Sequence, residues 1–399
     1  MINYSRSAQN MRSSEIRRLM KLAADPSIIS FAGGMPSNQL FPIDAINEIF
    51  NNLPLTLKQV ACQYGPTQGF PPLLESLKEY LKSKGLPLDN SQDLIITTGA
   101  QQAINLLSKV LLDPGDTVVT EYPSFIGAIA AFKSYQANLL PIALDNDGII
   151  IDQLIKTLDD PSNKNIKMIY LCPTFHNPAG IIYSRQRRID LLTALKGREI
   201  CLLEDDPYGE LYFNQCDAET TRSIKSLGTE AFPHCYTGSF AKIFGPGMRL
   251  GWLLGPREIV EKMELAKQSQ DACSSTFTQV LANQFLSDNR MPAYLDMLRP
   301  TYARRAKTML DALDRYMPAG ITWTTPRGGF YLWVTLPHAM NSSAVFDVAI
   351  KGGAAFVIGS AFDPLGTRNN TIRLAYSHSD ETKIEHGIKI IADAIKSIM

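Results

Sequence analysis

Short apolar runs alternate with amphipathic segments through the middle of the chain, from about residue 91 to residue 256. The runs include DLIITT, DTVVTEYPS, IKMIYLCP, REICLLEDD and HCYTGSF, and segments such as SFIGAIAAFKSY and SRQRRIDLLTAL separate several of them. Short apolar runs bounded by turn-forming residues predict strands, and the segments between them predict helices. Strands that alternate with helices predict an α/β fold, with a largely parallel sheet covered by helices on both faces.

The pattern changes towards the C-terminus. A long helix is predicted over residues 293–317, followed by the strand-rich runs GITWTTPRGGFYLWVTLP, AAFVIGSAF and NTIRLAYS and by a final amphipathic helix. This α+β texture predicts a second, smaller domain. We therefore expect an N-terminal arm over residues 1–44 that packs with the small domain, a large domain over residues 45–285, and a small C-terminal domain over residues 286–399.

The composition argues against several classes of protein. The chain has 399 residues, 45% of them hydrophobic, which is enough for a sizeable core, and 39 Lys and Arg residues balance 39 Asp and Glu residues. A nucleic-acid-binding protein would usually be basic. No apolar run approaches membrane-spanning length, and the N-terminus lacks the apolar stretch of a secretory signal. The six cysteines, without CxxC spacing, predict reduced thiols in a cytoplasmic protein, and the five histidines show no metal-ligand spacing.

The segment TGSFAKIFGPGMRLGW, residues 237–252, carries the strongest chemical signal. Lys242 is surrounded there by small and apolar residues, and burial of its ammonium group would be costly and would lower its pKa. A lysine in such a place is suited to form a Schiff base. Ser239 and Arg249 offer a hydroxyl and a fixed cation for a phosphate group. A lysine beside a phosphate clamp suggests pyridoxal phosphate as the cofactor.

Three consecutive acids follow the apolar run REICLL. Because side chains alternate along a strand, Asp205 is expected to face opposite to Glu204 and Asp206. At the carboxyl end of a parallel strand, Asp205 could keep the ring nitrogen of the cofactor protonated, so that the ring accepts electrons. The alternatives are a solvated loop edge and a Mg²⁺ site.

Two further turns follow predicted strands. In CPTFHNPAG, Asn177 could hydrogen-bond the phenolic oxygen of the cofactor, although Asn-Pro is also a common start of an ordinary turn. His176 beside it is expected to be a surface or packing residue. In TTGAQQAINLL, Gly99, Ala100 and Gln101 lie at a strand-to-helix junction, where free backbone N–H groups favour an anion. A plain tight turn is the alternative there.

Two more polar residues stand out from their surroundings. Tyr64, in the loop ACQYGPTQGFPPL, could reach a phosphate or could simply be packed. Arg373, in the apolar run NTIRLAYS, needs an anionic partner. A substrate carboxylate bound in a bidentate manner is one candidate, and an internal salt bridge is the other.

Taken together, these motifs resemble those of the class I and II aminotransferases, which are pyridoxal-phosphate enzymes of fold type I. The resemblance covers nearly the whole chain and is greatest to the branch that contains 2-aminoadipate aminotransferases and kynurenine aminotransferase II. The motifs that carry it are, in order, ISFAGGMPSNQLFP, QYGPTQG, TGAQQA, NPAG, EDDPYGELYF and SFAKIFGPGMRLGW. Each motif alone is weak, but their shared order makes the resemblance specific.

The resemblance implies roles for the residues around the ring of the cofactor. Lys242 would bond covalently to it and would later move the proton at the substrate's Cα. Asp205 would pair with the ring nitrogen, and Asn177 and Tyr208 would bind the phenolic oxygen. Phe125 stands where the family usually has a tyrosine. Its ring can still stack on the cofactor, but it lacks the hydroxyl.

The resemblance also implies how the phosphate is held. Ser239, Arg249 and the turn Gly99–Ala100–Gln101 would bind it, with Tyr64 reaching it from a neighbouring subunit. Ala100 stands where relatives often carry a serine, so that one hydroxyl donor, worth about 1 kcal/mol, is missing. We expect cofactor binding to be weakened only modestly.

Three residues are implied at the substrate. Arg373 would bind the α-carboxylate, and Gly34 would lie close to the substrate in a loop that closes over it. Arg17 is a candidate partner for a side-chain carboxylate, with a solvated helix face as the alternative.

The expected reaction is amino-group transfer between an L-amino acid and a 2-oxo acid by a ping-pong cycle in a homodimer. A lyase or a decarboxylase would use the same cofactor and the same first step, and the sequence separates these reactions poorly. A non-enzymatic sensor like the MocR regulators would carry a DNA-binding domain ahead of this one, whereas only about thirty residues precede the FAGG loop. No metal, nucleic acid or membrane partner is expected.

Overall fold

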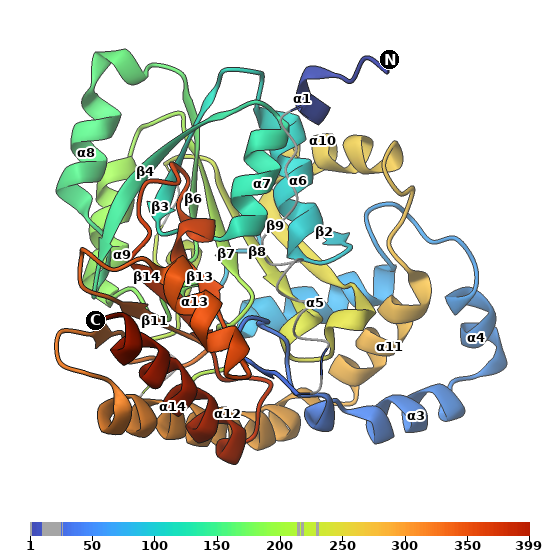
Figure 1. The fold of residues 1–399 in the computed structure, drawn as a ribbon. Coiled ribbons are helices and arrows are strands. Elements are labelled where there is room, and N and C mark those ends of the chain that lie inside the picture. Colours follow the sequence, from blue (N-terminus) through green and yellow to red (C-terminus); the bar gives the residue numbers. More distant parts are fainter. Residues whose placement is uncertain (1, 10–24, 26, 214–215, 217–218, 229–230) are drawn as a thin grey trace.

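Eight strands form a mixed sheet at the centre of the molecule (Figure 1). The computed structural model describes residues 2–9, 25, 27–213, 216, 219–228 and 231–399. The strands lie in the order β2 (Gln92–Thr97), β9 (Gly251–Pro256), β8 (His234–Ser239), β7 (Cys201–Asp206), β6 (Ile166–Leu171), β3 (Thr117–Tyr122), β4 (Asn138–Asp145) and β5 (Gly148–Ile149). The pairings that join β8, β7, β6, β3 and β4 are parallel, and those of β2, β9 and β5 are antiparallel. The predicted, largely parallel sheet is confirmed.

Helices cover both faces of this sheet, as the alternating pattern predicts. One face carries α6 (Ala100–Leu111), α7 (Ile126–Ser134) and α10 (Arg257–Gln268), and the other carries α8 (Ile151–Asp159) and α9 (Arg185–Leu195). Within β7, Leu203 belongs to the first of these apolar layers and Leu202 to the second. Successive side chains of a strand point to opposite faces, so the apolar strands are buried on both sides.

A further group of helices lies beside β2. It consists of α3 (Ile43–Asn52), α4 (Leu55–Ala61), α5 (Pro71–Ser83) and α11 (Thr276–Ser287), and α11 packs against the other three. The short helix α1 (Arg6–Gln9) lies apart from them, against α7. In the described part of the chain, no helix combines the length and the apolar character needed to span a membrane.

The C-terminal part of the chain forms a separate antiparallel sheet. Its order is β10 (Thr322–Trp323), β11 (Tyr331–Thr335), β14 (Thr371–Ala375) and β13 (Val357–Ile358). Both α12 (Met291–Tyr316) and α13 (Ser342–Lys351) pack against α14 (Glu381–Ile398). The long predicted helix is thus present as α12, close to its predicted bounds.

The N-terminal residues are tied to this C-terminal part. β1 (Ile29–Ser30) pairs in parallel with β12 (Ala354–Ala355). The predicted boundary at residue 286 lies in the last turn of α11, and the one at residue 44 lies at the start of α3. The division of the chain into three domains stays a prediction.

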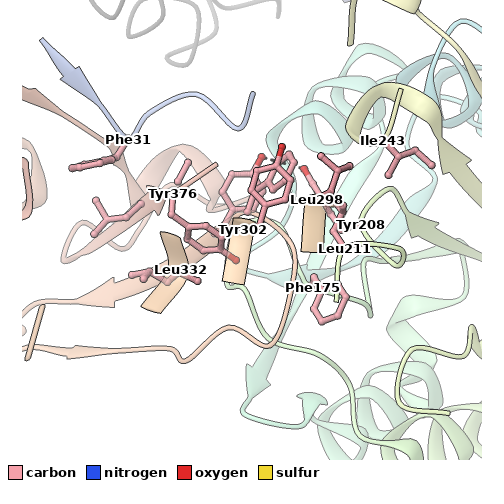
Figure 2. Packing of buried hydrophobic residues seen from close by; sticks show 14 of the residues in the cluster. Phe31, Phe175, Tyr208, Leu211, Ile243, Leu298, Tyr302, Leu332 and Tyr376 are labelled. Atoms are coloured by element: carbon pink, nitrogen blue, oxygen red, sulfur yellow. Dashed lines mark hydrogen bonds between the residues drawn. The ribbon is translucent and has the colours of Figure 1, made fainter. Parts of the chain in front are cut away.

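One apolar cluster extends between the two sheets. Figure 2 shows Phe31 and Tyr376 on the side of the small sheet, Tyr302 of α12 in the middle, and Tyr208 and Leu211 beyond it, in the segment that follows β7. All five side chains are buried. The large and small parts of the molecule therefore share a core, and the loops that follow β7 are fixed by it.

Candidate active site

Four predicted residues lie at one edge of the large sheet, where β6, β7 and β8 end. Asp205 is the penultimate residue of β7, Asn177 follows β6, Ser239 ends β8, and Lys242 ends the short helix η4 (Phe240–Lys242) after it. Because these three strands are parallel, their carboxyl ends meet at one edge, which is where ligands bind in open α/β sheets. The fold therefore gathers the residues that the motifs single out.

Asp205 is buried with only half of its carboxylate satisfied. Its Oδ2 atom accepts a hydrogen bond of 2.7 Å from the hydroxyl of Tyr170, whereas its Oδ1 atom is buried without a partner. Burial raises the pKa of Asp205 to about 7, and the negative charge of the nearby Glu121 also raises it. The hydrogen bond from Tyr170 and the positive charge of Lys242 act in the opposite direction. A buried, unpaired acceptor is unfavourable, so this oxygen requires a donor. A protonated ring nitrogen would supply one.

Lys242 is the amine of the site. Its Nζ atom donates to the carbonyl of Gly34 over 3.1 Å and lies 5.8 Å from the centre of the Tyr208 ring. Burial lowers the pKa of Lys242 to about 8, and the positive charges of Arg373 and Arg249 add to this effect. A lysine with a lowered pKa offers more of the uncharged amine near neutral pH, which is the nucleophilic form.

The predicted phosphate-binding residues meet at the start of α6. Arg249 has left-handed backbone angles, with φ at 49°, and its Nη2 atom donates to the carbonyl of Thr98 over 3.1 Å. A Cβ atom on Gly99 would lie 3.1 Å from that same nitrogen. Gly99 precedes α6 without a side-chain cap, so the N–H groups of Ala100 and Gln101 are open to an anion, whereas that of Gln102 donates to the carbonyl of Gly99. A cation and a helix N-terminus are thus adjacent, as a phosphate requires.

The neighbours of this turn have partners of their own. The Ser239 Oγ atom accepts the N–H of Ala241 at 3.1 Å and contacts the carbonyl of Leu250 at 3.4 Å, which is a long hydrogen bond. The Gln101 side chain donates to the carbonyl of Gly127 over 2.8 Å. Gln101, like Ala100 before it, therefore contributes its backbone rather than its side chain to the turn.

Arg373 is buried in β14 without an acidic partner. Its Nη1 atom donates to Oδ1 of Asn177 over 2.9 Å, its Nη2 atom donates to the carbonyl of Ala32, and its Nε atom is buried without a partner. The guanidinium lies over the rings of Tyr331 and Phe362, at 4.4 and 4.7 Å. Burial lowers the pKa of Arg373 from its ordinary value. Of the two alternatives for this residue, no internal salt bridge forms within the described part of the chain, so a carboxylate ligand remains.

Tyr208, Tyr331 and Gly34 complete the site. The hydroxyls of Tyr208 and Tyr331 are 3.1 Å apart, and both side chains are buried. Burial raises the pKa of Tyr208 well above its ordinary value, and Tyr331 adds to this. A Cβ atom on Gly34 would lie 1.6 Å from the Tyr331 hydroxyl oxygen. Only glycine therefore fits this position of the loop that covers Lys242.

The structure does not test the roles of three predicted residues. Tyr64 is 85% exposed. Phe125 directly precedes α7 and is half-buried on the apolar layer under that helix, with its ring beside Gly127 and the Gln101 side chain. Arg17 lies outside the described residues. The roles expected for these three stay predictions.

The other two acids of the EDD run have structural partners. Glu204 accepts two backbone N–H groups of the short helix η3 (Ile224–Ser226), and Asp206 accepts the hydroxyl of Tyr236 and a backbone N–H. Asp205 has different neighbours, as the strand alternation predicts. Among the described residues, no three His, Cys, Asp or Glu side chains are grouped as metal ligands would be.

Sequence reasoning missed three buried residues behind the site. Tyr170 binds Asp205, Tyr331 contacts Tyr208 and Arg373, and the Glu121 carboxylate accepts the N–H of Cys172 and lies 3.1 Å from Nε2 of His176. His176 is fully buried, so of the two roles expected for it the packing role is the one observed. Strand alternation, with a known pairing of β6 and β7, would have placed Tyr170 opposite Leu203 and so on the same face of the sheet as Asp205.

The residues present fit pyridoxal phosphate. Asp205 offers an unfilled acceptor for a ring nitrogen, Lys242 an amine for an aldehyde, and Arg249 with the start of α6 a site for a phosphate. Arg373 and Asn177, joined by a hydrogen bond, face the same region. These are the two ends and the reactive centre of that cofactor, together with a place for a substrate carboxylate.

Known proteins are similar to this chain over its full length. The family model for aminotransferase class I and II matches residues 30–391. The chain is 37% identical to aromatic-amino-acid aminotransferase 1 of Thermococcus litoralis, over 99% of this chain and 94% of that protein. It is 33% identical to 2-aminoadipate transaminase of Thermus thermophilus, over 99% and 97%.

Solved structures of aminotransferases are also similar to this chain. The structure of Pyrococcus horikoshii kynurenine aminotransferase superimposes with a TM-score of 0.94 at 40% identity, over 99% of this chain and 97% of that one. The α-aminoadipate aminotransferase of Thermus thermophilus, solved with N-(5'-phosphopyridoxyl)-L-leucine, gives 0.89 at 32% identity, with the same coverage. The chain therefore belongs to the class I and II aminotransferases, enzymes of fold type I that use pyridoxal phosphate.

Proposed function

We propose that the residues gathered at the edge of the large sheet carry out this transamination. Pyridoxal phosphate, when bound, supplies a ring that accepts electrons from the substrate's Cα. Asp205 would hold a proton on the ring nitrogen, and Ser239, Arg249 and the first turn of α6 would hold the phosphate. Asn177 and Tyr208 would bind the phenolic oxygen.

The substrate is handled by two basic residues. Arg373 would bind the α-carboxylate, which amino acids and 2-oxo acids share, so one cation serves both half-reactions. The Lys242 amine would take the proton from the substrate's Cα and deliver it to C4′ of the cofactor, on the other side of the nitrogen that joins them. Its lowered pKa, about 8, suits a base that must exist uncharged near neutral pH.

One observation carries this proposal. A carboxylate oxygen of Asp205 and the Nε atom of Arg373 are both buried without partners, and the charges of both residues act on Lys242. Unsatisfied buried groups of opposite sign destabilise a protein unless ligands complete them. A cationic ring nitrogen and an anionic carboxylate would complete these two.

A spectroscopic half-reaction tests the proposal. Purified holoenzyme mixed with an amino acid donor should lose the visible absorption of bound pyridoxal phosphate, and a 2-oxo acid should restore it. Lys242→Ala should abolish both changes, because no amine remains to move the proton. Release of ammonia or CO₂ in place of an oxo acid would contradict transamination.

The donor class is proposed to be aromatic and large apolar L-amino acids. Two aromatic rings lie against Arg373, those of Tyr331 and Phe362, and Tyr208 packs on Tyr331. The similar proteins named above include an aromatic-amino-acid aminotransferase and a kynurenine aminotransferase. A half-reaction screen over the twenty amino acids should rank phenylalanine and tyrosine first. A first rank for glutamate or 2-aminoadipate would instead favour the acidic class and a role for Arg17.

We further propose that the active form is a homodimer. Exposed apolar side chains gather on the helices beside β2, where Phe50 of α3 contacts Phe277 of α11 with ring centres 5.6 Å apart. Figure 1 shows where α3 and α11 lie. Leu55 and Tyr64 nearby are 71% and 85% exposed. An isologous contact would bury them and bring Tyr64 to the partner's phosphate site. Sedimentation velocity should show a dimer that Leu55→Glu dissociates, and a fully active monomer would contradict it.

Cytoplasmic localisation is also proposed. All six cysteines are described, none of them forms a disulfide, and four are buried. A protein that keeps this many reduced cysteines is suited to a reducing compartment. We also propose the domain division at residues 44 and 285, since the eight-stranded sheet lies wholly before the second boundary and the four-stranded sheet wholly after it.

A further inference from the structure

Tyr331 contacts three residues of the site, Tyr208, Arg373 and Gly34. It is the first residue of β11, it is 2% exposed, and its side chain points to the loop after β7. Its hydroxyl lies 3.1 Å from that of Tyr208, and its ring lies 4.4 Å from the Arg373 guanidinium carbon. The same hydroxyl fills the place of a side chain at Gly34, whose carbonyl accepts the Lys242 amine.

We propose that Tyr331 is a positioning residue, which orients the Tyr208 hydroxyl through a donated hydrogen bond and holds the Arg373 guanidinium against its ring. This inference rests on the proposed role of Tyr208 at the phenolic oxygen of the cofactor. It adds to that role a second hydroxyl, which touches Tyr208 rather than the reacting atoms.

The direction of the hydrogen bond follows from the partners available. Within the described part of the chain, Tyr208 is the one hydrogen-bond partner of the Tyr331 hydroxyl. If the Tyr208 hydroxyl donates its hydrogen bond to the phenolic oxygen of the cofactor, its own oxygen must accept the hydrogen bond between the two tyrosines, and Tyr331 must donate it. The Arg373 cation over the Tyr331 ring draws electron density from that phenol, which favours donation. A hydroxyl that accepts one hydrogen bond donates a stronger one, by roughly 10–30%.

The titratable groups around this pair are few. Arg373 and Cys172 act on Tyr208, Lys242 lies beside its ring, and Tyr376 lies near Tyr331. Tyr376 is a matched control, because it is fully buried and its hydroxyl donates to the carbonyl of Gly328 over 2.9 Å, away from Tyr208. Removing either hydroxyl deletes one buried hydrogen bond, but only Tyr331 belongs to the proposed chain of donors.

The test compares the holoenzyme with Tyr208→Phe, Tyr331→Phe and Tyr376→Phe. The readout is the pH midpoint of the change in the visible absorption of bound pyridoxal phosphate. A donor to the phenolic oxygen stabilises its deprotonated form, so loss of the donor raises this midpoint. We expect a shift of about 1–2 pH units for Tyr208→Phe, roughly 0.1–0.6 units in the same direction for Tyr331→Phe, and none for Tyr376→Phe.

The second readout separates ring from hydroxyl. Tyr331→Phe keeps the ring on Arg373, so the KM for the amino donor should stay within twofold, whereas Tyr331→Leu should raise it roughly 2- to 30-fold. A wild-type midpoint for Tyr331→Phe beside a shifted Tyr208→Phe overturns the inference alone. Unshifted midpoints in both variants overturn the inference and the proposed role of Tyr208 together.

Discussion

The two faces of strand β7 carry neighbouring acids that differ in how fully their carboxylate oxygens are hydrogen-bonded. On one face, Glu204 accepts two backbone N–H groups and lies 3.2 Å from His234 and 3.8 Å from Arg188, and Asp206 is satisfied by Tyr236 and a backbone N–H. On the other face, Asp205 has one oxygen bound to Tyr170 and one oxygen with no partner.

The difference shows which property marks a ligand site. Burial raises the pKa of Asp205 and of Asp206 alike to about 7, so an unusual pKa does not separate them. Unused hydrogen-bonding capacity does separate them. Of these three acids, only Asp205 has a buried oxygen without a partner, and a ligand could supply that partner. We therefore regard Asp205 as the functional acid and Glu204 and Asp206 as supports of the fold.

The largest effect is expected at the amine that faces Asp205. Lys242→Ala should lower kcat by at least about 10⁴-fold, because both the covalent attachment and the proton transfer are lost. The folded protein should remain, since Lys242 has a lowered pKa and gains little from burial. Single-turnover kinetics and circular dichroism measure the two. Retention of more than a hundredth of the activity would show that another group moves the proton.

A matched pair of substitutions tests the two faces directly. Asp205→Asn should lower kcat by about 10²–10⁴-fold and leave the apoprotein at least as stable, because it removes a poorly satisfied charge. Glu204→Gln should destabilise the protein by about 3 kcal/mol, because it leaves Arg188 and the buried network without their anion, while the folded fraction keeps a near-normal kcat. Urea unfolding and steady-state kinetics give both numbers.

The contrast between the two faces is wrong if Glu204→Gln shows the effects expected of Asp205→Asn, or the reverse. A stable, inactive Glu204→Gln enzyme would move the functional acid to the other face of β7. An Asp205→Asn variant that unfolds but turns over normally while folded would make Asp205 a structural residue.

The pH dependence of stability sharpens the same contrast. The folded pKa of Asp205, about 7, is above the unfolded value of about 3.9, so the folded apoprotein binds the extra proton and loses stability as pH rises between these values. Asp205→Asn removes this contribution and leaves that of Asp206. The variant should therefore lose about 1–3 kcal/mol less than wild type between pH 5 and pH 8 in urea titrations. Equal losses would show that Asp205 is ionised in both states.

The smallest effect is expected at the phosphate. Ser239→Ala removes one neutral hydroxyl and should weaken cofactor binding about fivefold, in line with about 1 kcal/mol. Ala100→Ser adds a hydroxyl at the start of α6 and should tighten binding by a similar factor. Fluorescence titration of the apoprotein with pyridoxal phosphate measures both. No change in either variant would place the phosphate away from this turn.

Much of this site can be predicted from sequence because its chemistry is local. The apolar surroundings of Lys242, and the alternation that separates Asp205 from its neighbours, are visible in short stretches of chain. The large sheet and the long helix α12 follow from periodicity, which reports burial directly.

The contacts that complete the site depend on pairing across the fold. Tyr170 meets Asp205 because β6 pairs with β7, and Arg373 meets Asn177 across the boundary between the two sheets. Nothing near Tyr331 in the sequence indicates that its hydroxyl will lie against Gly34 and Tyr208. Such contacts require the three-dimensional arrangement, since no local pattern encodes a partner so distant along the chain.

The most direct measurement is the ¹⁵N chemical shift of pyridoxal phosphate labelled at the ring nitrogen and bound to the protein at pH 8. The account predicts a protonated nitrogen in the wild type and in Glu204→Gln, and an unprotonated one in Asp205→Asn. An unprotonated nitrogen in the wild type would contradict the assignment of the unfilled Asp205 oxygen to the cofactor.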